Sequence, residues 1–141
     1  MTISRDTGYT FSICLHIPFT EAERQVRAAL QKEGFGILTE ADIQAAFQEK
    51  LERAFRPYKI RGACNPALAY EALSSELEIG AFLPCNVILY EEDGEVVVSA
   101  MDPEAVLSLV SRAEVEEIAG EVRGRLERAL EQVARSGEAN E

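Results

Sequence analysis

Cys64, Asn65 and Pro66 form the first of two Cys-Asn pairs in a chain that has only three cysteines. Asparagine followed by proline is typical of a helix start, because asparagine caps the first turn and proline lacks an N–H that would go unpaired there. A thiol beside that start lies near unpaired N–H groups and the positive end of the helix dipole. Cys64 could therefore be a reactive thiolate of lowered pKa, or the N–H groups could bind a carboxylate or phosphate. The structural alternative is that Asn65 and Pro66 only begin the helix and Cys64 is a small buried side chain.

The second pair, Cys85 and Asn86, follows Pro84 at the start of a predicted strand. If this strand runs antiparallel to the one that ends near Cys64, the two thiols can be neighbours. If the helix between them makes an ordinary crossover, the strands are parallel and the thiols lie at opposite edges of the sheet. The sequence leaves both topologies open. Neighbouring thiols would permit a redox role in which Cys85 resolves Cys64.

Glu40 and Asp42 flank a predicted strand-to-helix turn and could act as a carboxylate pair. Their structural interpretation is that both favour the positive end of the following helix, with Asp42 completing a capping box with Thr39. Both residues belong to the candidate ligand-binding set.

Cys14 and His16 are two residues apart on a predicted strand, so their side chains point to the same face. With Cys64 and Cys85 they would complete a three-cysteine, one-histidine zinc set. The chain has neither a CxxC nor an HxxxH spacing, so no specific zinc signature supports this set, and we assign no metal ligand.

Composition restricts the class of protein. A chain of 141 residues, 47% of them hydrophobic, fits one globular domain. Its net charge of -11 disfavours nucleic acid and anionic membranes as partners. The polar start is not typical of a signal peptide, and no apolar run reaches the roughly 18 residues of a membrane helix. Three cysteines make no disulfide framework, so we expect reduced thiols and a cytoplasmic protein.

The pattern of apolar residues predicts the elements that position these side chains. Alternation from Tyr9 to Ile17 indicates a half-buried strand, and Asp93-Gly94 indicates a tight hairpin between two β-rich runs. The other predicted strands cover residues 35–40 and 58–63. The predicted helix starts are Thr20 with Glu23, Thr39 with Asp42, Asn65-Pro66, Asp102-Pro103 and Ser111 with Glu114, and Gly34 ends the first helix.

The resulting order is β-α-β-α-β-α-β-β-α-α, without a linker or repeat. It predicts one two-layer α+β domain over residues 1–141, with a frayed tail at about 135–141. We expect a mixed or mainly antiparallel curved sheet of about five strands, with the helices packed on one face.

The segments GFGILTEAD, YKIRGACNPALAYEAL and IGAFLPCNVILYEEDGEVVVSAMDP, in this order, resemble the family known as domain-of-unknown-function family 302. Ala41 and Phe82 depart slightly from the family's pattern. The resemblance implies a small bacterial or archaeal α+β protein with a TBP-like arrangement and a dimeric state, and it implies no activity. The family's motif maps onto Glu40, Asp42, Cys64, Asn65, Pro66, Cys85 and Asn86.

The function is unknown from sequence, and three hypotheses remain. The leading one is a small-molecule-binding or accessory homodimeric domain, with a polar pocket at the Cys64-Asn65-Pro66 helix start and an anionic or polar ligand. The second is a thiol-based redox protein or enzyme that uses Cys64 and Cys85, and the third is a zinc-stabilised domain. The sequence contains no nucleophile elbow, phosphate-binding glycine loop or Ser-His-Asp order, and it indicates no cofactor.

Overall fold

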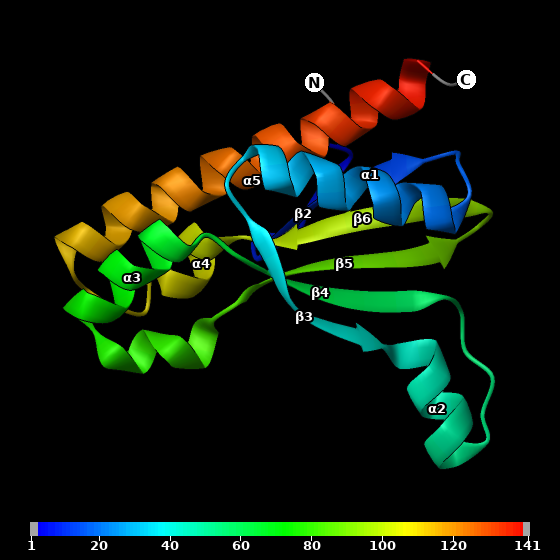
Figure 1. Cartoon of the computed structure of the whole chain (residues 1–141), viewed down its shortest axis with the longest axis horizontal. Helices are drawn as coiled ribbons and strands as arrows, with labels where there is room; N and C mark the ends of the chain where they lie inside the picture. The colour runs from blue at the N-terminus through cyan, green and yellow to red at the C-terminus, as the bar shows by residue number, and fades with distance from the viewer. Residues whose placement is uncertain (1–2, 140–141) are drawn as a thin grey trace.

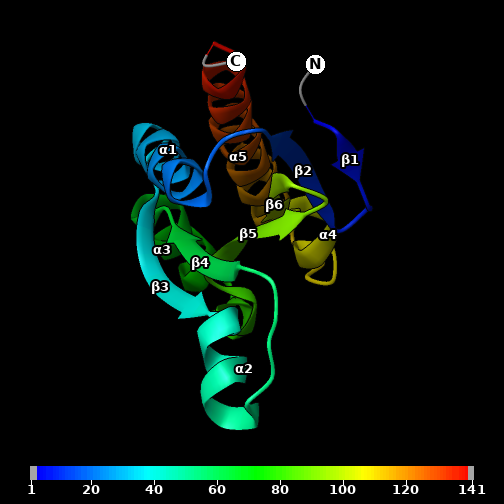
Figure 2. The same ribbon diagram turned by 90° about the vertical axis from the view of Figure 1, so that its right-hand side faces the viewer.

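The computed structural model describes residues 3–139 as a curved, wholly antiparallel sheet of six strands, with helices on one face (Figures 1 and 2). The strand order is β1-β2-β6-β5-β4-β3. The strands are β1 (Arg5–Asp6), β2 (Thr10–Leu15), β3 (Gly36–Asp42), β4 (Tyr58–Cys64), β5 (Cys85–Glu92) and β6 (Glu95–Met101). The helices are α1 (Phe19–Lys32), α2 (Ile43–Leu51), α3 (Pro66–Ser75), the 3-10 helix η1 (Leu77–Phe82), α4 (Pro103–Leu107) and α5 (Ala113–Ala139). The α+β fold is confirmed, and β1 is the strand that the sequence did not reveal.

The core lies between the sheet and the helices α1 and α5. Alternate residues of the central strands are fully buried there, among them Phe11, Ile13, Leu89 and Val98. The central strands β2 and β5 therefore contribute one apolar face, as a sheet covered on one side requires, whereas no residue of the edge strands β1 and β3 is buried. Tyr9, expected on the same face, precedes β2 and is 65% exposed.

Of the two predicted ends of α1, the C-terminal one is correct and the N-terminal one is not. The helix begins at Phe19 after Pro18, and among the described residues no side chain caps it. Thr20 therefore lies inside the first turn, and the predicted capping box with Glu23 is wrong. Gly34 follows the helix with a φ of 88°, which confirms it as the residue that ends α1.

Two other predicted caps are displaced. Asp42 itself caps α2, because its side chain accepts a hydrogen bond of 2.9 Å from the Ala45 N–H. Thr39 lies within β3 and caps nothing. The helix α5 begins at Ala113, two residues after the expected cap Ser111.

The predicted hairpin is confirmed. Asp93 and Gly94 have φ angles of 51° and 80°, the left-handed conformation that a tight turn between β5 and β6 requires.

At the C-terminal end of the chain, α5 continues to Ala139, through most of the segment expected to fray. Residues 140–141 lie outside the described part of the chain. Within the described part, no helix has the length and apolar character needed to cross a membrane.

The two ends of the sheet carry different helices. The helices α3 and α4, together with η1, gather at one end, whereas α2 projects from the other end, away from the body (Figure 1). This separation places the cysteine-containing segments and α2 far apart.

Candidate functional site

The strands β4 and β5 bring the two Cys-Asn pairs together. They pair in antiparallel register with Ala63 opposite Cys85, so Cys64 and Cys85 are neighbours. Of the two topologies that the sequence left open, the antiparallel one is therefore confirmed. Both thiols are free.

The start of α3 is closed by its own residues. The Leu68 N–H donates a hydrogen bond of 3.2 Å to Asn65 Oδ1, and Pro66 occupies the first helical turn. The structural interpretation of Asn65-Pro66 is thus confirmed. A ligand anion would have to displace this cap to reach the Leu68 N–H.

A small apolar cavity of about 30 Å³ lies beneath α3, between the ends of β4 and β5 and the helices α4 and α5. Cys64, Asn65 and Cys85 line it, while Pro66 and Asn86 do not. The rest of its wall is Phe35, Ala63, Leu68, Ala69, Ala72, Leu83, Pro84, Pro103, Leu107, Ile118 and Val122. A cavity therefore lies beside the start of α3, and its lining is mainly apolar, whereas the pocket predicted from the sequence was polar.

Burial changes the chemistry of both thiols in the same direction. It raises the pKa of Cys85 to about 11, and the neighbouring Cys64 contributes to that rise. Burial also raises the pKa of Cys64. The lowered pKa that the helix start suggested is contradicted, because desolvation disfavours the thiolate. Both side chains are neutral thiols near pH 7.

Three of the predicted site residues lie elsewhere. Glu40, on β3, pairs with Arg27 and Arg61, and the hydrogen bond from Arg27 is the main reason why its pKa is lowered. Asp42 caps α2 at the far end of β3. Asn86 is exposed on the sheet face opposite the core helices. The structure thus brings together Cys64, Asn65 and Cys85, and leaves the two carboxylates apart from them.

One charged cluster was not predicted from the sequence. The carboxylate of Glu23, on α1, forms ion pairs with Arg61 Nη2 at 2.8 Å and with Lys59 Nζ at 2.9 Å. Arg61 is 9% exposed. Lys59 and Arg61 alternate along β4, which indicates a shared face. Nothing in the local pattern shows that this face is covered by α1, so the cluster could not be found from spacing.

The proposed zinc set does not assemble. Cys14 lies opposite Val97, and Val97 lies opposite Tyr90, well along β5 from Cys85. His16 instead faces Glu95 at 3.3 Å. Across residues 3–139 no three histidine, cysteine or carboxylate side chains are grouped as a metal site.

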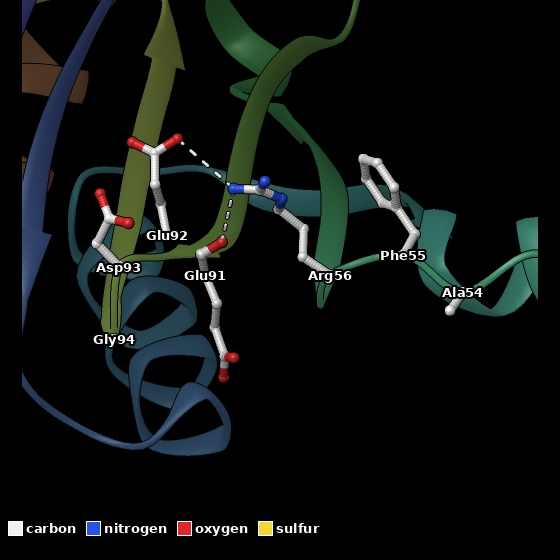
Figure 3. Close-up of a pocket in the computed structure, with 7 residues that line it drawn as sticks. All are labelled: Ala54, Phe55, Arg56, Glu91, Glu92, Asp93 and Gly94. Atoms are coloured by element: carbon white, nitrogen blue, oxygen red, sulfur yellow. Dashed lines mark hydrogen bonds and ion pairs between the residues drawn. The ribbon is translucent and has the colours of Figure 1, made fainter.

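A second hollow, wide and shallow, lies where the segment after α2 meets the β5–β6 hairpin (Figure 3). Arg56 reaches across it and contacts the Glu91 carbonyl at 3.2 Å and Glu92 Oε2 at 3.5 Å. The Phe55 side chain lies on the side of Arg56 that is away from Glu92 (Figure 3). Since the Arg56 charge is already paired, this hollow is an anchor for the α2 segment rather than an anion site.

Residues 11–133 match the protein family described as "Domain of unknown function DUF302". The chain belongs to this family. A crystal structure of an uncharacterized conserved DUF302 protein from Bacillus stearothermophilus has the same fold, with a TM-score of 0.83 and 27% sequence identity. The match covers 88% of this chain and 97% of that one. No curated protein matches the sequence. The family and its neighbour thus identify the fold and assign no activity.

Proposed function

We propose that this DUF302 domain binds a small, uncharged and mainly apolar molecule in the cavity beneath α3. The observation that carries the proposal is the lining: two neutral thiols and one capping amide are its polar groups, and the remaining wall is apolar. Apolar pockets with a few convergent polar groups are typical of small-molecule sites.

The cavity is small in the closed state, and α3 offers a way to enlarge it. A volume of about 30 Å³ has room for only one or two water-sized molecules. Of the ten residues of α3, all within the described chain, only Ala72 is buried. An outward shift of α3 as an intact helix, which separates only Ala72 and the half-buried Leu68 from the core, would admit a ligand of several non-hydrogen atoms.

The lining favours this ligand over the anionic or polar one predicted from sequence. Among the described residues no lysine or arginine lines the cavity, and Asn65 already occupies the helix start. The redox hypothesis has weaker support, because the raised pKa values disfavour the thiolate that attacks other groups.

Thermal denaturation with matched probes tests the proposal. Benzene should raise the melting temperature, whereas benzoate, which carries a charge on the same ring, should not. Saturation at 100 times the dissociation constant corresponds to about 2.7 kcal/mol of added stability. If no uncharged probe raises the melting temperature, or if benzoate does so more strongly than benzene, the proposal is wrong.

A matched pair of α3 variants locates the binding. Ala69→Leu fills the cavity and should abolish the benzene response, because Ala69 lines the wall. Ala67→Leu adds the same side chain on the exposed side of α3 and should leave the response intact. A response that survives Ala69→Leu would place binding elsewhere.

Compartment and partners also remain proposals. The free thiols of the structure support a reducing compartment, so we propose the cytoplasm. That the protein binds neither nucleic acid nor membranes stays a prediction from its net charge.

A further inference from the structure

The C-terminal end of α3 is tied to the segment in which α5 begins (Figure 1). Arg112 donates hydrogen bonds of 2.8 Å from Nη1 to the Ser75 carbonyl and of 3.0 Å from Nη2 to Glu76 Oε2. The Ser75 hydroxyl donates a third, of 2.9 Å, to Glu114 Oε1. These three contacts form the Arg112 latch, which joins segments that lie 36–39 residues apart in the sequence.

The Arg112 latch acts at a carbonyl that the helix leaves without a partner. Ser75 is the last residue of α3, and the last carbonyls of a helix have no N–H within it to accept from. A cation at this position also interacts favourably with the negative end of the helix dipole. The last turn of α3 contains no basic residue. Arg112 therefore supplies, from another segment, the positive charge that α3 lacks at its C-terminal end.

The face of α3 that lies on the core buries few side chains. Only Ala72 is buried, and Leu68 packs against the core while partly exposed. By comparison, α1 buries five residues. The stabilisation that apolar burial provides grows with the area removed from water, so it is smaller for α3 than for α1. The polar contacts of the Arg112 latch are accordingly a larger share of what keeps α3 closed over the cavity.

The chain on the far side of the Arg112 latch is anchored again. Glu76 has extended backbone angles and is the one residue between α3 and η1. Ile79, within η1, is fully buried. The extended backbone at Glu76 therefore forms a joint at which α3 can shift outward while η1 stays packed. Such a shift moves Ser75 away from Arg112, so the latch must break when the cavity enlarges.

We infer that α3 is a lid over the cavity and that the Arg112 latch sets how often this lid opens. The inference rests on the proposed function, because it concerns access to the same cavity. A ligand of several atoms fits only while α3 is displaced, so the bound protein has already lost the latch. The latch therefore opposes binding, and a protein without it populates the open, binding-competent state more.

The alkylation rate of Cys85 measures the opening of the lid without any ligand. Cys85 lines the cavity and is 5% exposed, so iodoacetamide reaches it when α3 opens. Mass spectrometry of the peptides separates Cys85 from the other two cysteines. Arg112→Gln should accelerate this alkylation at least about fivefold, because it removes charge-assisted contacts of the closed state. Arg128→Gln is the matched control: Arg128 also lies exposed on α5, but its partner is Glu33, after α1, so the rate should not change.

Urea denaturation separates an opened lid from a lost fold, since global unfolding also exposes Cys85. The inference is supported if Arg112→Gln raises the alkylation rate by a larger factor than it raises the equilibrium constant of unfolding. An equal rise in both, or alkylation no faster than in Arg128→Gln, would overturn it.

Benzene binding separates the failure of this inference from that of the proposed function. Arg112→Gln should bind benzene at least about fivefold more tightly than the wild type, because its binding-competent state is more populated. Faster alkylation of Cys85 in a protein that binds no benzene would support the latch and reject the proposed function. Benzene binding that is equally tight in Arg112→Gln and the wild type would overturn the latch and leave the proposed function in place.

Discussion

The helices α2 and α3 begin in the same way and end in different environments. Each directly follows a strand, and each is capped by a residue, Asp42 or Asn65, whose side chain accepts a hydrogen bond from the backbone three residues later. They differ by one residue in length. Yet α3 covers a cavity at the end of the sheet, whereas α2 buries none of its residues within the described chain.

The comparison shows that the residues that begin a helix are distinct from the interactions that keep it folded. A cap specifies where a helix begins and contributes about 1 kcal/mol, which is too little to hold nine residues helical in water. Packing contributes the rest, and it depends on which surface the chain places nearby. For α3 that surface is the protein's own core, whereas no residue of α2 is buried within the described chain.

The largest expected contrast comes from the same substitution in each helix. Ala72→Asp buries a carboxylate against the cavity wall and should lower the free energy of unfolding by about 3–5 kcal/mol, as an unpaired buried charge does. Ala45→Asp, on the exposed surface of α2, should change it by less than about 0.5 kcal/mol. Urea denaturation of both variants measures the contrast, and comparable losses would show that α2 is as well packed as α3.

A pH titration of stability tests the buried thiol beneath α3. The pKa of Cys85 is raised from its ordinary value of 9.0 to about 11, so the folded protein holds a proton that the unfolded chain releases in this range. This contribution is fully present below pH 9 and is lost as the pH rises toward about 11, a decline of about 2–3 kcal/mol. Chemical denaturation of the wild type and of Cys85→Ala across that range isolates it. Parallel curves for the two proteins would mean that Cys85 is not desolvated.

The smallest contrast concerns the two caps. Asn65→Ala should lower global stability by about 1 kcal/mol, because α3 is packed on the cooperative core. Asp42→Ala should remove the corresponding hydrogen bond in α2 while leaving the midpoint of global unfolding nearly unchanged. Circular dichroism and urea midpoints distinguish the two. Equal shifts of the midpoint would contradict the difference between the helices.

Local chemistry explains which parts of the fold could be predicted. Asn65-Pro66 and Asp102-Pro103 start helices through a capping side chain and the fixed φ of proline, and Asp93-Gly94 adopts the positive φ angles of a tight turn; all three predictions are confirmed. The caps expected at Thr20, Thr39 and Ser111 failed. Thr20 lies inside a helix and Thr39 inside a strand, where the pattern of a capping box does not act as one, and Ser111 lies in the loop two residues before α5 begins.

The geometry of the site depends on contacts between distant segments, which the spacing of residues along the sequence does not reveal. The sequence identified Cys64, Asn65 and Cys85, yet the direction of β5 relative to β4 decides whether the thiols meet. Burial then reverses the predicted shift of the Cys64 pKa, because desolvation outweighs the helix start. The apolar wall of the cavity comes from distant segments of the chain, such as Phe35 and Val122. The sequence pattern indicates only that these residues belong to the core.

Hydrogen exchange, resolved by helix, tests most directly whether α2 lacks support within its own chain. We expect the amides of α2 to exchange at least about tenfold faster than those of α3. Amides of α2 that are as protected as those of α3 would contradict the account.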